Sequence, residues 1–121
     1  MILDRCRDTE ELKRLYESRP MPSQYNFDWL LGNPNLFCFY GETKGDLRGF
    51  ITVQVEDGLL TLSGTSVRHN MPDNVDAIIM VCNAFNQDMY AFTPLKHAAK
   101  VLKMAGFEHI ENDKYVRYKN G

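Results

Sequence analysis

The chain has 121 residues, of which 44% are hydrophobic and 25% are charged, and its formal net charge is −2. This length predicts a single domain over residues 1–121 and excludes a two-domain enzyme or a repeat array. The small negative charge excludes a basic protein that coats nucleic acid, so nucleic acid is not an expected partner.

The cysteines and histidines show no grouping that would hold a disulfide framework or a metal ion. The three cysteines, Cys6, Cys38 and Cys82, are an odd number without a CxxC pair, and the three histidines are widely spaced. We therefore expect reduced thiols, no metal site and a cytoplasmic location. The first residues are too charged for a secretion signal, and no apolar run approaches the ~18 residues of a membrane span, so no membrane partner is expected.

The N-terminal part of the sequence predicts one strand and two helices. Weak alternation over residues 1–6 indicates a short strand. A helix is expected from Asp8, which has capping-box spacing to Glu11, and it ends before the Arg19-Pro20 pair. A short second helix is expected over residues 27–31, before a glycine, an asparagine and a proline.

The middle of the sequence predicts an antiparallel meander. Asp57-Gly58 is a strong signal for a two-residue hairpin turn, because both positions of that turn need a positive φ. Three strands are expected around it and before it, over residues 36–40, 47–55 and 59–67.

The last part of the sequence alternates helices and strands. One helix is expected to begin with Asp73 or Asn74 as its N-cap. The next has Thr93 as N-cap and Pro94 in its first position, and Gly106 ends it. The remaining strands are expected over residues 89–92, 107–110 and 115–118.

The predicted order of elements is βααβββαβαββ, which indicates an α/β (α+β) fold with a mixed sheet. A strand, a helix and another strand between residues 59 and 92 imply one parallel pair joined by a crossover helix. The strands before that pair are antiparallel. Helices are therefore expected on both faces of the sheet.

The last helix carries the most specific resemblance to a known family. Residues 95–107 read Leu-Lys-His-Ala-Ala-Lys-Val-Leu-Lys-Met-Ala-Gly-Phe. Ala98, Gly106 and Phe107 match the pattern Asn-x-x-Ala…Tyr-x-x-x-Gly-Phe of the last helix in the GNAT (Gcn5-related N-acetyltransferase) family. With the order of elements, the chain resembles this family over essentially its whole length, which implies one GNAT-like domain with a six- or seven-stranded mixed sheet.

The resemblance also implies where coenzyme A would bind. Members of the family hold its pyrophosphate on a glycine-rich loop before a helix, through backbone N–H groups. The corresponding stretch here is Arg68-His69-Asn70-Met71-Pro72-Asp73. Arg68 fits, but Met71 is large, Pro72 lacks an N–H, and the Asp73 carboxylate beside a phosphate would cost about 1–4 kcal/mol. The cofactor-binding positions that the resemblance implies are Thr65, Val67, Arg68 and Asn74.

The catalytic positions of the family are also altered. Its tyrosine, which often protonates the coenzyme thiolate, falls on Leu102, and its asparagine falls on Leu95. A leucine side chain cannot transfer a proton. Tyr90 is near in sequence but belongs to a predicted strand, and it is the one candidate for a catalytic role.

Two function classes follow from the resemblance. The favoured one is a degenerate, non-catalytic binding or assembly protein, similar to short GNAT-like proteins of phage heads or virions, without a cofactor. Its partners would be virion components or a second copy, in the host cytoplasm or the virion. The alternative is an acetyl-CoA-dependent N-acetyltransferase with an atypical pyrophosphate loop. The number of N–H groups that the loop presents would discriminate between them.

The basic residues near the C-terminus have an ordinary explanation. Lys96, His97, Lys100 and Lys103 follow helical spacing, and Lys114, Arg117 and Lys119 come after them. A phosphate contact is one interpretation. The polar, solvent-facing side of an amphipathic helix is the favoured one.

Overall fold

A computed structural model of the chain describes residues 2–4, 9–17, 27–33, 35–41, 47–66 and 71–119. These residues belong to two compact units, one of Met1–Thr52 with Gly64–His69 (unit 1) and one of Val53–Ser63 with Asn70–Gly121 (unit 2). The elements are β1 Ile2–Asp4, α1 Thr9–Glu17, α2 Phe27–Gly32, β2 Leu36–Tyr40, β3 Leu47–Glu56, β4 Leu59–Ser66, α3 Met71–Phe85, β5 Met89–Phe92, α4 Lys96–Met104, β6 Glu108–Glu111 and β7 Lys114–Arg117.

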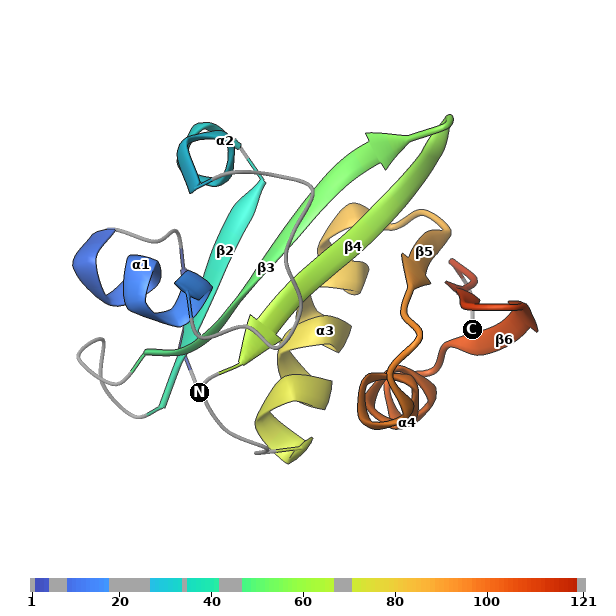
Figure 1. Cartoon of the computed structure of the whole chain (residues 1–121). Helices are drawn as coiled ribbons and strands as arrows, with labels where there is room; N and C mark the ends of the chain where they lie inside the picture. Colours follow the sequence, from blue (N-terminus) through green and yellow to red (C-terminus); the bar gives the residue numbers. More distant parts are fainter. Residues whose placement is uncertain are drawn as a thin grey trace. The chain divides into compact units, whose positions relative to one another are not determined.

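The order of elements along the chain confirms the predicted order βααβββαβαββ (Figure 1). Hydrogen-bonded neighbours follow the order β1-β2-β3-β4-β5-β7-β6 in a seven-stranded sheet. Strands β4 and β5 run parallel, whereas β1–β2, β2–β3, β5–β7 and β6–β7 are antiparallel. The predicted mixed α/β sheet is therefore confirmed.

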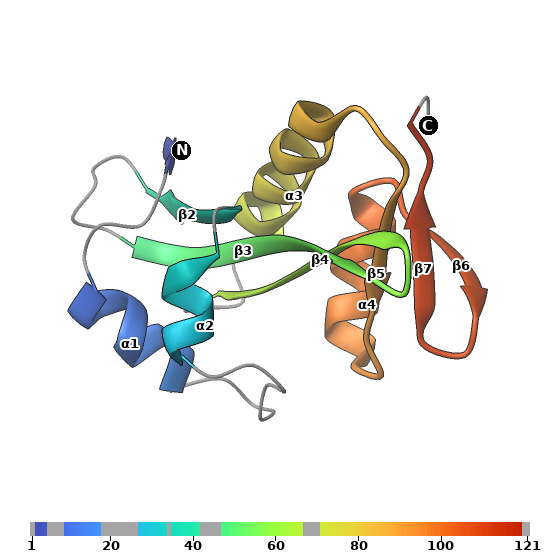
Figure 2. The ribbon, with the colours of Figure 1, turned by 90° about the horizontal axis from the view of Figure 1, so that it is seen from above.

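The core of unit 1 lies between α1 and strands β2 and β3. Leu12 of α1 is fully buried in an apolar cluster with Leu36, Cys38 and Tyr40 of β2 and Phe50 of β3. The three β2 residues are spaced by two, so they share one face of the strand. Figure 2 shows α1 and α2 together on one side of β2.

The hairpin between β3 and β4 forms as the sequence predicts. Asp57 has a φ of 51° and Gly58 a φ of 79°. Two positive φ values in a two-residue loop define a type I′ turn, whose twist matches that of the flanking strands. The turn connects the end of β3 at Glu56 directly to the start of β4 at Leu59.

In unit 2, helices α3 and α4 lie against one face of β5 and β7. Met89 and Arg117 are in register, so their side chains share a face. Arg117 Nε donates a hydrogen bond of 3.0 Å to the carbonyl oxygen of Ala105, at the end of α4. The Arg117 charge also acts on the thiol of Cys82 in α3. This face of the strands is therefore covered by both helices, which explains the burial of Met89 and Ala91.

Helix α3 begins earlier than predicted. It starts at Met71, so Asp73 and Asn74 lie in its first turn and neither is the residue before the helix. Pro72 is tolerated there because the N–H groups of a first turn have no acceptor within the helix. Asp73 and Asn74 therefore predicted correctly that a helix forms here, but the predicted start of the helix was too late in the sequence.

Helix α4 begins two residues later than predicted. Its N-cap is Leu95, with φ −86° and ψ 128° and without a side-chain cap. Thr93 Oγ1 accepts a hydrogen bond of 3.1 Å from the Leu95 N–H. The Thr93 N–H donates to the carbonyl oxygen of Asp113, in the turn between β6 and β7, at 2.9 Å. That tertiary contact holds Thr93 and Pro94 outside the helix.

Helix α4 ends at Met104, and Gly106 occupies the C′ position just beyond it, as predicted. Gly106 has a φ of 95°. Its N–H donates to the carbonyl oxygen of Lys103 at 3.1 Å, and the Phe107 N–H donates to that of Leu102 at 3.0 Å. These two bonds form a Schellman motif, and the side chains of Leu102 and Phe107 are both buried, as the motif favours.

The cysteines correct the expectation of reduced thiols. Cys38 is disulfide-bonded, and its partner lies outside the described residues. Cys82 is a free, buried thiol, as expected for a small core residue. The spacing of cysteines along the chain could not predict the bond, because the pairing of β1 with β2, which sets Asp4 opposite Cys38, brings distant segments together.

Candidate functional site

The parallel strands β4 and β5 are in register at Thr61 and Tyr90. Strand β5 ends two residues later, at Phe92, and the chain passes through residues 93–95 into α4. In open α/β sheets, ligands bind beyond the carboxyl ends of parallel strands. The carboxyl end of β5 is therefore the part of unit 2 where a ligand is expected.

The structure describes two of the four predicted cofactor-binding positions. Thr65 belongs to strand β4. Asn74 lies in the first turn of α3, where it is half-buried. Val67 and Arg68 lie outside the described residues. The grouping of these four positions around a cofactor stays a prediction.

The first turn of α3 is better suited to an anion than its sequence indicates. A 15-residue helix carries a partial positive charge at its N-terminus, where several N–H groups have no acceptor within the helix. Pro72 removes only one of these groups, because the helix begins at Met71. Of the unfavourable residues in the predicted loop, the half-buried Asp73 is the one whose charge still opposes an anion.

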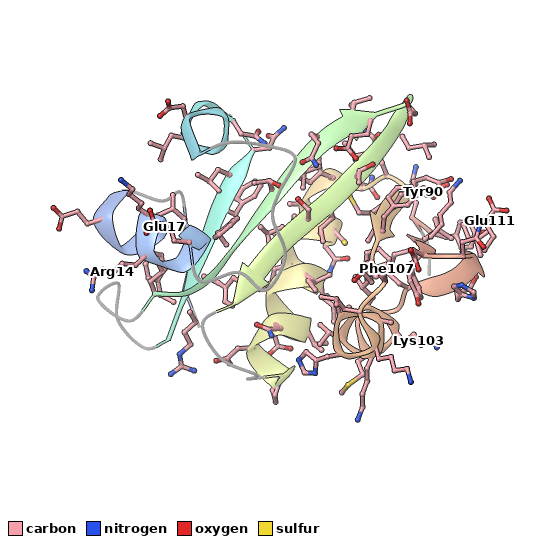
Figure 3. All side chains as sticks on the ribbon, viewed as in Figure 1. Arg14, Glu17, Tyr90, Lys103, Phe107 and Glu111 are labelled. Carbon is pink, nitrogen blue, oxygen red and sulfur yellow. The ribbon has the colours of Figure 1, made fainter. Side chains whose placement is uncertain are left out.

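Tyr90 lies on the face of β5 that points away from α3 and α4. It neighbours Met89 and Ala91, which face those helices, and successive side chains of a strand point to opposite faces. Its ring is half-buried, and the Nζ atom of Lys114 lies 5.3 Å from the ring centroid. Figure 3 shows Tyr90 on β5 and Glu111 at the outer edge of β6. Tyr90 is thus a phenol on β5, in register with Thr61 of the parallel strand β4.

The position of the family's catalytic tyrosine holds no proton donor. Leu102 is 5% exposed and packs inside unit 2. Leu95, which falls on the family's asparagine, is the N-cap of α4 and is exposed. The predicted loss of these two polar groups stands, and Tyr90 stays the candidate for a catalytic role.

Cys82 is not suited to nucleophilic chemistry. Burial raises the pKa of its thiol to about 11, and the Arg117 charge lowers it only in part. The thiolate is the reactive form of cysteine, so this thiol is inert near neutral pH. Among the described residues, no group of three or more His, Cys, Asp and Glu side chains could hold a metal ion.

The basic residues of the last quarter separate into different surfaces. Lys96, His97, Lys100 and Lys103 are exposed on α4, and Figure 3 shows Lys103 projecting away from the strands. Arg117 faces α4, whereas Lys114 lies on the opposite face of β7. No helix in the described part of the chain is long and apolar enough to cross a membrane.

Sequence reasoning missed the surface formed by Phe92 and Lys114. The sequence shows Phe92 only as the end of an apolar strand, and Lys114 only as one of several C-terminal cations. The β5–β7 register places them directly opposite each other. That register could have been found only by recognising that β7 inserts between β5 and β6.

The fold is that of the GNAT acetyltransferases. A solved structure of the aminoglycoside acetyltransferase AAC(6')-Ib with coenzyme A matches 98% of this chain and 96% of its own, at a TM-score of 0.67 and 13% identity. The same enzyme with paromomycin and acetyl-CoA matches 99% of this chain and 95% of its own, at a TM-score of 0.64 and 14% identity. A complex with coenzyme A and kanamycin gives the same score and identity. No protein-family model and no curated protein matches the sequence.

These comparisons correct two expectations from the sequence. The favoured function, a non-catalytic phage assembly protein, is wrong, because the solved structures with this fold are acetyltransferases. The expectation of no cofactor is wrong for the same reason, since those enzymes hold acetyl-CoA or coenzyme A. Both expectations rested on side chains of the loop, and the first also on Leu95 and Leu102 of the last helix. Phosphate binding at a helix N-terminus depends on backbone N–H groups, which side-chain identity does not reveal.

Proposed function

We propose that this chain is an acetyl-CoA-dependent N-acetyltransferase. The observation that carries the proposal is a fold match over 98–99% of the chain to acetyltransferases in complex with acetyl-CoA or coenzyme A. The parallel β4–β5 pair and the 15-residue helix α3 that follows β4 are the parts of the fold that such a cofactor requires. We infer a cytoplasmic enzyme because acetyl-CoA is supplied there; reduced thiols no longer support this location, since Cys38 is disulfide-bonded.

In this proposal the N-terminus of α3 holds the pyrophosphate of acetyl-CoA. Its partial positive charge and first-turn N–H groups suit phosphate oxygens. Arg68 and Asn74 would add polar side chains beside the phosphates, and the backbone of Thr65 and Val67 would pair with the pantetheine arm. Asp73 weakens the site without abolishing it, because one carboxylate opposes the dipole and several donors.

The reaction would be a direct acyl transfer. The nitrogen of a neutral primary amine forms a bond to the acetyl carbonyl carbon, and the carbon–sulfur bond of the thioester breaks. The amine loses one proton to solvent, and the departing thiolate gains one. We assign the second proton transfer to Tyr90, since it is a phenol on the parallel strand β5, two residues before its carboxyl end, and Leu102 cannot donate a proton.

Titration calorimetry with acetyl-CoA, with coenzyme A as a control, tests binding. We expect a dissociation constant in the range of roughly 1 μM–1 mM that is typical of enzyme substrates. Release of the coenzyme thiol in the presence of primary amines, kanamycin among them, tests transfer. The absence of heat with both ligands at millimolar concentration, together with no thiol release, would refute the proposal.

Substitution of Tyr90 tests its role in the reaction. Tyr90→Phe should lower kcat by about 100-fold, because general acid catalysis contributes about 10²–10⁴-fold, and should leave the acetyl-CoA dissociation constant unchanged. Tyr118→Phe is the matched control, since Tyr118 is an exposed tyrosine just beyond β7. An unchanged kcat in Tyr90→Phe would remove Tyr90 from the mechanism while leaving the proposed activity intact.

A further inference from the structure

Lys114 is a half-buried cation without a carboxylate partner in the described part of the chain. Its one interaction there is with the ring of Tyr90, whose centroid lies 5.3 Å from Nζ. Glu111 stands directly opposite it in the β6–β7 register, but the two side chains form no ion pair. A cation that is partly removed from water attracts an anion more strongly than a fully solvated lysine does.

Lys114 belongs to an open surface at the carboxyl end of β5. Phe92 is in register with Lys114, and Tyr90 precedes Phe92 by two residues, so all three side chains share one face. We call these three residues the β5–β7 surface. Phe92 is 51% exposed although it is the largest apolar side chain of the strand end. Small-molecule sites combine apolar and aromatic side chains with a few polar groups that fix the orientation of the ligand, and Phe92 and Lys114 supply one of each.

The two helices of unit 2 leave this surface uncovered. Both α3 and α4 lie on the opposite face of β5 and β7, as the hydrogen bond of Arg117 to Ala105 and the effect of the Arg117 charge on the pKa of Cys82 indicate. Figure 2 shows β7 beside β5, with β6 beyond it at the edge. Phe92 is the part of this face that a small molecule can reach, since its side chain is 51% exposed, whereas Val116 on the same face is fully buried.

The charged side chains on this face lie on two neighbouring strands. Lys114 lies on β7, next to Phe92. The exposed carboxylates of Glu108 and Glu111 lie one strand further out, on β6. A ligand that rests on Phe92 therefore meets a positive charge first. Lys114 is therefore the group on this face that would pair with the carboxylate of a ligand resting on Phe92, while Glu108 and Glu111 lie farther from Phe92.

We infer that the β5–β7 surface binds the acceptor of the proposed acetyl transfer, and that Lys114 selects an apolar α-amino acid. The inference rests on the proposed function. The carboxylate of the acceptor would pair with the Lys114 ammonium group, its apolar side chain would rest on Phe92, and its amine would point to the acetyl group beyond the end of β5. The acceptor class thus differs from the aminoglycosides bound by enzymes of the same fold.

Pairs of amines that differ only by a carboxylate provide the test. L-phenylalanine is compared with phenethylamine, and L-leucine with isoamylamine, by the rate of coenzyme thiol release. We expect the carboxylated member of each pair to have a kcat/KM at least ~10-fold higher, because hydrogen bonds to charged groups are among the stronger ones. Lys114→Met should reduce this ratio to near 1, and Lys114→Glu should reverse it. Lys103→Glu, on the exposed face of α4, is the matched control and should leave the ratio unchanged.

Binding of the product gives a readout that needs no catalysis. In ligand-detected NMR, N-acetyl-L-phenylalanine should bind the wild-type protein and lose affinity in Lys114→Met, whereas the Lys103→Glu variant should behave as wild type. Equal kcat/KM for the two members of each pair, or transfer to kanamycin but to neither amino acid, would overturn the inference and leave the proposed function standing. If acetyl-CoA does not bind and no amine is acetylated, the proposed function fails instead.

Discussion

The backbone at the end of helix α4 predicts how much a substitution of Gly106 would lower the free energy of unfolding. Gly106 has a φ of 95°, and a β-carbon added there would lie 3.3 Å from Arg117 Nε. The left-handed backbone costs an L-residue about 1–2 kcal/mol. Displacing Arg117 would weaken its hydrogen bond to the Ala105 carbonyl oxygen, a loss of up to about 1.5 kcal/mol. Gly106→Ala should therefore lower the free energy of unfolding by about 1–3 kcal/mol.

A second glycine separates the two contributions. Gly58 has a φ of 79°, and a β-carbon there would meet nothing within 4 Å. Gly58→Ala should therefore show the backbone term alone, about 1–2 kcal/mol. Any further loss in Gly106→Ala belongs to Arg117, and the double variant Gly106→Ala with Arg117→Met should show less than the sum of the two single losses.

Urea denaturation measures the loss in the free energy of unfolding, and we expect an unchanged m-value. The melting temperature Tm should fall by roughly 4 °C for each kcal/mol lost in a chain of this size. A Gly106→Ala variant as stable as the wild type would refute the left-handed backbone conformation at Gly106. Strictly additive losses in the double variant would refute the role given to Arg117.

Two further predictions concern charge. Asp73→Asn should tighten acetyl-CoA binding by about 5-fold or more, because the carboxylate repels an anion, and calorimetry measures this change. The same variant should lose about 0.3–1 kcal/mol of folding stability, because the carboxylate interacts favourably with the helix dipole, and urea denaturation measures this loss. Asp76→Asn, exposed on the same helix, is the control, and unchanged affinity in Asp73→Asn would contradict phosphate binding there. Cys82 should resist iodoacetamide at pH 8, since burial raises its pKa to about 11. Because the unfolded thiol ionises first, the free energy of unfolding should fall as the pH rises from about 9 to 11, and Cys82→Ala should lack this component. Rapid native-state alkylation at pH 8, read by mass spectrometry, would contradict the burial.

The local signals predicted the elements well. Asp57-Gly58 predicted the β3–β4 hairpin, and Gly106 predicted the end of α4, because both depend on backbone conformations that only a few residue types adopt. The start of α4 was wrong by two residues. Its predicted cap, Thr93, is held by a hydrogen bond to Asp113, a residue that lies far along the chain.

The predicted site was less complete than the predicted fold. Tyr90 was identified from the sequence only because it is near the last helix along the chain, although it belongs to a strand. Lys114 and Phe92 were not joined to it, because the contact depends on β7 inserting beside β5. Val67 and Arg68, predicted from the resemblance, lie outside the described residues. The disulfide at Cys38 was missed for a related reason, since strand pairing decides which segments meet.

The sequence by itself determined the order of elements, the hairpin turn and the helix end, and through them the resemblance to a family of acetyltransferases. These properties depend on neighbours within a few residues, so local patterns of charge, glycine and apolar spacing are sufficient. Only the tertiary structure decided that β7 lies between β5 and β6, that Arg117 faces α4, and that Lys114 faces the open side. Register is set by pairing between distant segments, and in a strand a shift of one residue sends every side chain to the opposite face.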